Sequence, residues 1–459
     1  MDITLGEAAR ATGAVLRGGD PDGVITGVST DTRTLKQGDL FIALRGDNFD
    51  GRSFVDRARE MGAAGAVVAR DADGAAGALL AVDDTLVALQ RLAAWYRQRF
   101  DFPVIGVTGS VGKTGTKDMI AGVLGGRLSV HKTPANLNNE IGLPLTLLAL
   151  RPGHQAAVLE MAMRASGEID QLCRLAGPTA GVITTVGESH LEFLGSVENI
   201  ARAKGELLDH IPAQGFALLG ADHPLLRREA ARCRGKVIFY GQSPDADLVL
   251  TSYRPEGTGA WMEVRDGTNR AEYFLPLAGR HNAVNALAAI GVARELGLSS
   301  EEIGRGLSTL RPAAMRLAVL DLGRILLIDD AYNASPTSTG AALETLAQLA
   351  GNRRKVAVLG DMLELGELAP GGHRVVGAAA AAQGVDLLVT VGNLAGLIAE
   401  GARLAGLPES RVFSVPDNRA ALELLADLLG DADVVLVKGS RGMHMEEIVA
   451  GLQGRYVEC

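Results

Sequence analysis

The chain has 459 residues, 47% of them hydrophobic, which predicts a folded protein of about three domains at ~150 residues each. Its net charge of −9, its 4% of aromatic residues and the lack of a basic stripe argue against a nucleic-acid partner. No apolar run approaches the ~20 residues of a membrane span, and the start MDITLGEAAR lacks the features of a secretory signal. Three scattered cysteines are typical of a reducing compartment, so we expect a cytoplasmic protein.

Residues 1 to about 100 predict a small α/β unit with one polar segment. The expected elements are a helix over 5–12, strands over 24–28, 40–44 and 66–68, and a helix over 54–61. The segment STDTR, residues 29–33, places hydroxyl, carboxylate and guanidinium groups at a strand end, which suits a small polar ligand. An equally good alternative is a turn in which the Ser and Asp side chains cap the backbone.

The stretch FPVIGVTGSVGKTGTKD, residues 102–118, is the most informative in the chain. An apolar run over 104–107 predicts a buried strand, and the apolar spacing that continues to Leu124 predicts a helix. Between them lies a loop of Thr108, Gly109, Ser110, Val111, Gly112, Lys113 and Thr114. Loop and helix N–H groups would face phosphate oxygens, Lys113 would reach the outer phosphates, and the Thr114 hydroxyl would ligate magnesium.

The loop matches the general phosphate-binding pattern imperfectly. That pattern requires Gly, four residues and then Gly-Lys-Ser/Thr, whereas position 107 here is Val and the glycines fall at 106 and 109. The alternative is an ordinary glycine-rich turn between a strand and a helix. The strand before the loop and the helix after it favour nucleotide binding.

Two further strand ends in the region 101–312 carry polar residues. The strand over 157–159 ends at Glu160, and the strand over 181–186 leads into a loop with His190. Because ligands bind beyond the carboxyl ends of strands in open α/β sheets, both residues are candidate magnesium ligands, directly or through water. Taken singly, a strand-end Glu is usually solvated and a lone His is usually structural.

The helix expected over 197–211 has a lysine on its apolar stripe. Lys204 stands between Ile200 and Leu207, at a position where a hydrophobic residue is expected. Either its side chain reaches water at a domain edge, or its amine lies in the site, bare or chemically modified to an acid.

The pattern changes twice in the rest of the chain. Alternating runs over 248–277, separated by EGTG and DGTN, predict an antiparallel meander. His281, Asn282 and Asn285 then open a helix, where they contact a base edge or cap the helix. From about 313, strands expected over 325–328, 356–359, 387–391, 412–415 and 434–437 alternate with helices, which predicts a doubly wound domain.

The ordered set TGSVGKT, Glu160, His190, ARAKGE, GRHNAVNALAA and IDDAYNASPTS resembles the Mur ligases of peptidoglycan synthesis over nearly the whole chain. Within that family, STDTR, the stretch 46–51, NLNNEIGLP, GDMLELG and VKGSRGMHME resemble the ligase of the last step. The sister ligase, which adds diaminopimelate or lysine, carries a DNPR-type signature. Residues 417–419, DNR, lack its proline and sit at an apparent helix start.

The resemblance implies an α/β fold of three domains and an ATP-dependent ligation. Residues 1–100 would form a small N-terminal α/β domain that binds the UDP end of the substrate. Residues 101–312 would form a P-loop ATPase-like domain with a mostly parallel sheet and an antiparallel meander, and residues 313–459 a Rossmann-like domain for the incoming dipeptide. With ATP and Mg²⁺, D-alanyl-D-alanine would be joined to UDP-N-acetylmuramoyl-tripeptide through an acyl phosphate, by a monomer with no membrane span.

The resemblance also implies three sets of site residues. The catalytic set is Lys113 and Arg316, which would neutralise phosphates, with Glu160, His190 and a carbamylated Lys204, which would hold magnesium together with Thr114. The ATP set adds to the loop residues His281, Asn282 and Asn285 near the adenine, Arg316, and Asp330 near the ribose or phosphates. The substrate set is Ser29, Asp31 and Arg33 for the UDP moiety, Asn138 and Asn139 for the peptide, Tyr332 and Asn333 for the dipeptide, and Thr30 and Asn48 without a more specific part of the substrate.

Three other interpretations compete with this one. The sister ligase that adds the third amino acid is the nearest rival. A folylpolyglutamate synthase-like ligase would have its phosphate loop near the start of the chain, whereas about 100 residues precede it here. A nucleotide-binding switch without ligase activity would leave Lys204 and His190 without a role.

Overall fold

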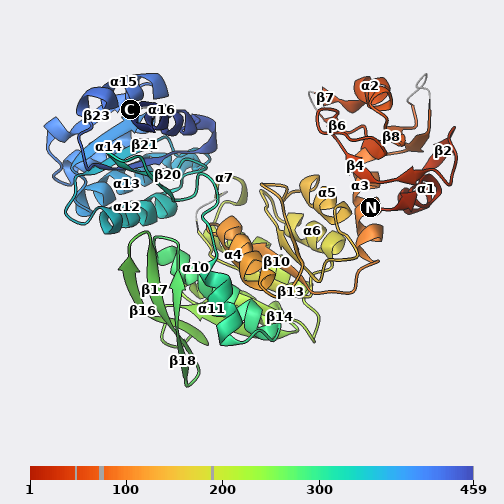
Figure 1. Ribbon diagram of the computed structural model, residues 1–459, viewed down its shortest axis with the longest axis horizontal. Helices are drawn as coiled ribbons and strands as arrows, with labels where there is room; N and C mark the ends of the chain where they lie inside the picture. The colour runs from red at the N-terminus through yellow and green to blue at the C-terminus, as the bar shows by residue number, and fades with distance from the viewer. Residues whose placement is uncertain (47–48, 72–76, 188–190, 458–459) are drawn as a thin grey trace.

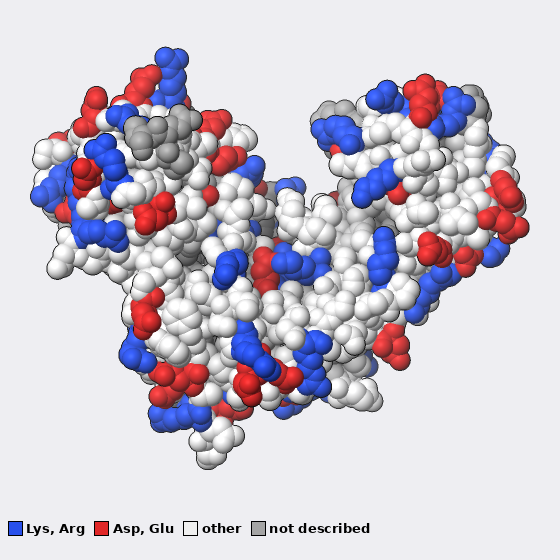
Figure 2. Space-filling model, in the orientation of Figure 1, with Lys and Arg blue, Asp and Glu red and all other residues white. Residues whose placement is uncertain are grey.

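The computed structural model describes residues 1–46, 49–71, 77–187 and 191–457, which fold into three α/β domains, each built around its own main sheet. Figure 1 shows the N-terminal and C-terminal domains on either side of the central one. In the space-filling view the molecule is hollowed between the two outer domains (Figure 2). The expected fold class is confirmed.

The N-terminal domain has a five-stranded sheet of order β2-β9-β8-β5-β4, parallel except at β2. Its main elements are α1 (Leu5–Thr12), β2 (Val15–Arg17), β4 (Gly27–Ser29), β5 (Asp39–Ile42), α2 (Val55–Glu60), β8 (Gly65–Ala69), β9 (Leu79–Val82) and α3 (Thr85–Arg97). The single strand expected over 24–28 is wrong. It is interrupted at Thr26, whose N–H donates to Gly38 O. The part before this residue, β3 (Val24–Ile25), pairs with β1 (Ile3–Thr4) in a separate two-stranded sheet.

The central domain has a nine-stranded sheet of order β11-β12-β10-β13-β14-β15-β16-β17-β18. The strands are β10 (Val104–Thr108), β11 (Val130–Lys132), β12 (Ala156–Glu160), β13 (Ala180–Ile183), β14 (Phe216–Gly220), β15 (Lys236–Gly241), β16 (Leu248–Glu256), β17 (Gly259–Asp266) and β18 (Asn269–Leu275). Pairings from β11 to β16 are parallel and the last two are antiparallel, which confirms the meander. β10 lies between β12 and β13, so the carboxyl ends of these three strands are neighbours.

Helices cover both faces of this sheet and bury one hydrophobic core on each. The helices are α4 (Lys113–Gly125), α5 (Gly142–Leu148), α6 (Glu168–Ala176), α7 (Leu191–Leu194), α8 (Val197–Asp209), α9 (Pro224–Glu229), α10 (Arg280–Glu295) and α11 (Ser300–Ser308). α8 approaches β10 at Gly106, where a Cβ would lie 2.9 Å from Leu207 Cδ1. Because α8 connects two parallel strands, it runs back along the sheet, and Lys204 lies nearer the carboxyl ends than Leu207.

The C-terminal domain has a six-stranded sheet of order β19-β20-β24-β21-β22-β23, parallel except at β19. Its elements are β19 (Ala318–Asp321), β20 (Leu326–Asp330), α12 (Pro336–Ala350), β21 (Lys355–Gly360), α13 (Ala369–Ala382), β22 (Leu387–Val391), α14 (Gly396–Leu404), β23 (Val412–Val415), α15 (Asn418–Leu428), β24 (Val434–Lys438) and α16 (Glu446–Val457). All five expected strands are present. Asp417 accepts from Ala420 N–H and caps α15, so the DNR segment does start a helix.

Hydrogen bonds join both outer domains to the central one, and one hydrophobic core also continues from the N-terminal domain into the central domain. Tyr96 and Arg97 of α3 donate to the central carbonyls of Leu150 and Ala176, at 3.1 and 2.9 Å. On the other side, Tyr253 of β16 donates to Gln348 of α12 at 2.8 Å. Within the described part of the chain, no helix is long and apolar enough to cross a membrane.

Candidate active site

The loop after β10 has the backbone conformation that a phosphate cradle needs. Gly109 and Gly112 adopt φ angles of 151° and 87°, which glycine tolerates best. At Gly109 an added Cβ would overlap Thr184 Oγ1 and lie 3.1 Å from Thr185 N. α4 begins directly after Gly112, so the N–H groups of Lys113, Thr114 and Gly115 have no partner within the helix. These N–H groups provide a site for an anion.

The end of β13 holds the loop in this shape. Thr184 Oγ1 donates to Val111 O at 2.6 Å, and Val111 N–H donates to Thr185 Oγ1 at 2.9 Å. Ser110 N–H donates to Thr185 O at 2.9 Å. β13 ends at Ile183, whereas the sequence predicted a strand that continues to Val186. The Thr184 N–H still donates to Thr108 O at the end of β10, but the side chains of Thr184 and Thr185 bond the loop.

The Lys113 side chain, at the first residue of α4, folds back over the phosphate loop. Its Nζ donates to Gly109 O at 2.7 Å. Burial lowers the pKa of Lys113, the Glu160 carboxylate opposes that shift, and the Arg316 guanidinium adds to it. The charges of Glu160 and Arg316 therefore both act on the Lys113 ammonium group.

Glu160, at the end of β12, is a buried carboxylate with one oxygen free. Oε1 accepts from Asn138 Nδ2 at 2.8 Å, whereas Oε2 is buried and has no hydrogen-bond partner. Lys117 Nζ lies 3.8 Å from Oε2, which is too far for a hydrogen bond. No cluster of three or more His, Cys, Asp or Glu side chains is found among the residues that the structure describes. Glu160 ends the strand that pairs with β10, the strand before the phosphate loop. A free carboxylate oxygen there fits Mg²⁺, which commonly takes one or two carboxylates along with phosphate oxygens.

Lys204 is almost completely buried, with 1% of its surface exposed. Burial, and then the charge of Lys113, lower the pKa of Lys204 well below its ordinary value. Of the two possibilities left open by the sequence, a side chain that reaches water at a domain edge is excluded. Lys204 is an amine inside the protein, close enough to Lys113 to be affected by its charge.

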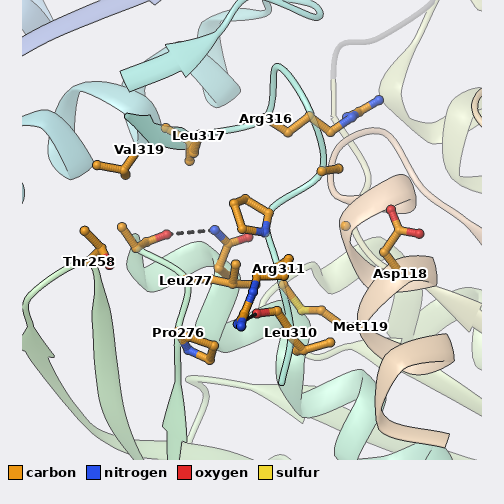
Figure 3. Close-up of a pocket in the computed structure, with 15 residues that line it drawn as sticks. Asp118, Met119, Thr258, Pro276, Leu277, Leu310, Arg311, Arg316, Leu317 and Val319 are labelled. Atoms are coloured by element: carbon orange, nitrogen blue, oxygen red, sulfur yellow. Dashed lines mark hydrogen bonds between the residues drawn. The ribbon is translucent and has the colours of Figure 1, made fainter. Parts of the chain in front are cut away.

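A cavity of about 280 Å³ lies against α4, one turn from the loop. Figure 3 shows its lining residues converging from α4, the turn between β16 and β17, the segment after β18 and the linker after α11. Met119, Leu277 and Leu310 give it apolar walls, and Asn282 supplies an amide whose Nδ2 donates to Ala278 O at 2.7 Å. Apolar walls with few polar groups suit a purine base. Of the residues that line the cavity, only Asn282 and Arg316 were predicted from the sequence, because the lining comes from segments that are far apart in the chain.

The linker between the central and C-terminal domains carries Arg316. Its neighbours Met315 and Leu317 have positive φ angles of 58° and 52°, and Leu317 N–H donates to Asp330 Oδ1 at 3.2 Å. The Arg316 guanidinium stacks 4.0 Å over the ring of Tyr332, and Figure 3 shows the Arg316 side chain pointing away from the cavity. The Tyr332 N–H also donates to Met315 O, so the linker is fixed against the C-terminal domain.

Asp330 is tied to a lysine that the sequence analysis did not single out. Lys438 Nζ, at the end of the neighbouring strand β24, donates to Asp330 Oδ2 at 2.6 Å and to Asn333 O at 2.9 Å. Burial raises the pKa of Asp330, and Lys438 opposes that shift. The signal that could have revealed Lys438 is its place at the end of a predicted buried strand, as the first residue of KGSRG.

Helix α10 brings its polar residues to two different neighbours. A Cβ on Gly112 would lie 3.0 Å from Asn285 Oδ1, so Asn285 borders the phosphate loop. His281 lies towards the C-terminal domain, where burial and then the charge of Lys438 lower its pKa to about 4. The structure therefore brings Asn282 and Asn285 to the cavity and the loop, and His281 to the domain boundary.

The remaining candidates have local roles in the structure or lie outside it. Ser29 Oγ accepts from Asp31 N–H, and Asp31 forms a salt bridge of 2.6 Å with the exposed Arg33, which is the capped-turn alternative. Asn139 Oδ1 accepts from Gly142 N–H at the start of α5. Thr30 is half-buried beside this turn. His190 and Asn48 fall outside the described residues.

The sheet, the phosphate loop and the adjoining cavity define a nucleotide-binding protein of the P-loop type. The chain belongs to the Mur ligase family. Residues 24–98 match "Mur ligase family, catalytic domain", residues 107–293 match "Mur ligase middle domain", and residues 315–441 match "Mur ligase, glutamate ligase domain". The family expected from the sequence is confirmed.

The similar proteins are named as the same ligase, UDP-N-acetylmuramoyl-tripeptide–D-alanyl-D-alanine ligase or MurF. The UDP-N-acetylmuramoyl-tripeptide–D-alanyl-D-alanine ligase of Bacillus subtilis strain 168 is 45% identical over 433 residues, 94% of this chain and 93% of that protein. MurF from Acinetobacter baumannii has a solved structure with a TM-score of 0.90, 33% identity and 99% coverage of both chains. MurF ligase from Thermotoga maritima, solved in complex with ADP, has a TM-score of 0.84, 30% identity and coverage of 94% of this chain and 98% of that one.

Proposed function

We propose that this protein is an ATP-dependent ligase that joins D-alanyl-D-alanine to UDP-N-acetylmuramoyl-tripeptide in peptidoglycan precursor synthesis. The observation that carries the proposal is the 45% identity to a ligase of that name over almost the full length of both chains. The phosphate loop and its cavity supply the ATP site that such a ligase needs. The sister reaction, addition of diaminopimelate or lysine, is the alternative that this likeness disfavours.

Each domain would bind one substrate. We assign the UDP end to residues 1–100, ATP to 101–312 and the dipeptide to 313–459. The three main sheets fall within these ranges, which supports the division. Because all three sites lie in one chain, the proposal requires only a monomer, and because ATP and the UDP-linked precursor are intracellular compounds, we place the protein in the cytoplasm.

In the first step a carboxylate oxygen of the tripeptide would attack the γ-phosphorus of ATP, and ADP would leave. Two anions must approach each other, so the residues around them must supply positive charge. Lys113, Arg316 and the N–H groups at the start of α4 would do so. Bound Mg²⁺ would add charge stabilisation at the phosphates. Thr114, His190 and the free Oε2 of Glu160 would hold it.

In the second step the dipeptide amine would attack the carbonyl carbon of the acyl phosphate. A C–N bond would form, the C–O bond to phosphate would break, and the amine would release a proton. We propose that Tyr332 and Asn333 lie near the dipeptide and that His281, Asn282, Asn285 and Asp330 contact ATP. Ser29, Asp31 and Arg33 would contact the UDP moiety, and Thr30 and Asn48 would also contact the substrate. For Asn138 and Asn139, contact with the peptide rests on the resemblance alone, since one bonds Glu160 and the other caps a helix.

Lys204 would be carbamylated. A neutral amine adds to CO₂, forms an N–C bond and loses a proton, which leaves a carboxylate on the side chain. Burial and the nearby Lys113 favour the neutral amine and so support this reaction. The product would be a carboxylate-like ligand for a second Mg²⁺ in place of a buried neutral amine.

Phosphate release from ATP and Mg²⁺ tests the proposal. We expect release that requires both UDP-N-acetylmuramoyl-tripeptide and D-alanyl-D-alanine. Release that requires the UDP-dipeptide and a free diamino acid instead would transfer the assignment to the sister ligase. Turnover that is independent of any amine would contradict ligase activity altogether.

A further inference from the structure

Lys117 is a buried lysine for which neither the phosphate loop nor the substrates provide a role. It lies on α4 one turn after Lys113, and only 2% of its surface is exposed. Lysine is rarely buried unless it is paired, because a buried charge must be compensated. The groups around Lys117 therefore indicate what its charge does.

Its ammonium group is fixed between three elements. Nζ donates to Thr133 O, just after β11, at 2.9 Å. It lies 3.5 Å from Asp118 Oδ1 on its own helix and 3.8 Å from Glu160 Oε2 at the end of β12. Thr133 is also bonded to Glu160, since Glu160 N–H donates to Thr133 Oγ1 at 2.9 Å. Lys117 and Glu160 thus share one anchor residue.

At 3.8 Å the Lys117 ammonium group attracts the Glu160 carboxylate electrostatically but does not form a hydrogen bond with Oε2. The hydrogen bond of Nζ goes to Thr133 O, and Oε2 remains buried without a partner. Asn138 holds the other oxygen, Oε1. Buried polar atoms in native proteins are nearly always bonded, so a free carboxylate oxygen beside a cation indicates a position kept for a ligand.

We propose that Lys117 is a positioning residue for magnesium: through its charge it holds Glu160 with Oε2 free to face a metal ion at the phosphate loop. Lys117 acts through Glu160 and does not touch the nucleotide. This inference rests on the proposed role of Glu160 as a magnesium ligand. Partners that orient metal ligands typically change metal affinity by ~10–100-fold when they are removed.

Magnesium-dependent nucleotide binding tests the inference without catalysis. The Kd of a non-hydrolysable ATP analogue is measured by calorimetry in EDTA and again at saturating Mg²⁺, and the ratio of the two values gives the coupling between metal and nucleotide. In Lys117→Met we expect the ratio to fall by about 10–100-fold, with the Kd in EDTA unchanged. Lys117→Gln keeps a donor for Thr133 O but removes the charge, and we expect the same loss.

Lys132→Met is the matched control. Lys132 bonds the same Asp118 carboxylate, Nζ to Oδ1 at 2.7 Å, but its side chain is 48% exposed. We expect the control to keep the ratio of the unmodified protein. If Lys117→Met does not fold, Lys117→Gln decides alone.

Three results would overturn the inference, and the third would also contradict the proposed role of Glu160 on which it rests. A Lys117→Gln protein with the full ratio would show that the charge is not needed, whatever its melting temperature. A higher ratio would show that Lys117 repels the metal. If the unmodified protein itself shows no gain from Mg²⁺, and Glu160→Gln is no different, the proposed magnesium role of Glu160 fails and the inference fails with it.

Discussion

Replacing Gly109 with alanine tests whether the loop after β10 binds nucleotide in the shape described. The new Cβ would overlap Thr184 Oγ1, which cannot move away freely because Thr184 is buried and bonded to Val111 O. Overpacking costs ~1–3 kcal/mol and a non-glycine residue at such a φ costs ~1–3 kcal/mol, so the strain is about 2–6 kcal/mol. The loop relieves this strain by leaving its position against β13.

Nucleotide binding must then restore the strained shape. We expect the Kd of a non-hydrolysable ATP analogue to rise by at least ~30-fold, the equivalent of the lower value of about 2 kcal/mol. Calorimetry measures it. Gly125→Ala is the control, because Gly125 is exposed at the end of the same helix and its Cβ would meet nothing within 4 Å. A Gly109→Ala protein with unchanged affinity would refute the assignment of this loop to phosphate.

Three further predictions concern ionisable groups inside the protein. Lys204→Ala loses phosphate release and regains part of it with a small carboxylate such as acetate; full activity without rescue would contradict carbamylation. Lys438→Met leaves Asp330 buried without its cation, which costs about 3–5 kcal/mol and lowers a melting temperature by on the order of 10 °C; Arg33→Ala, at an exposed pair, leaves it unchanged. His281 is held neutral with a pKa of about 4, whereas a free histidine has a pKa of about 6.5. The neutral side chain therefore contributes about 3 kcal/mol to the free energy of unfolding above pH 6.5, and this contribution is lost as the pH falls towards 4. Melting scans over this pH range should show a smaller drop in melting temperature for His281→Gln than for the unmodified protein.

The sequence alone determined the features that depend on neighbouring residues. The strand, glycine turn and helix around Lys113 span residues 104–125. Hydrophobic spacing specifies the strand and the helix, and the glycines specify the turn between them. The meander was predicted from alternating runs and turn residues for the same reason. Lys204 was found because a lysine on an apolar stripe conflicts with the helix period, and burial of that stripe follows from the same period.

Only the tertiary structure decided which distant residues meet. The sheet places β10 between β12 and β13, an order that differs from the order in the chain, and so brings Thr184 to Val111 and Glu160 to Lys117. Lys117 was missed because a lysine on a helix is expected at the solvated face. Its spacing of four from Lys113 was the available signal, since residues four apart share a face. Hydrophobic periods specify the face of each element, but the order of strands is set by packing across the whole domain, and it is that order which builds the site.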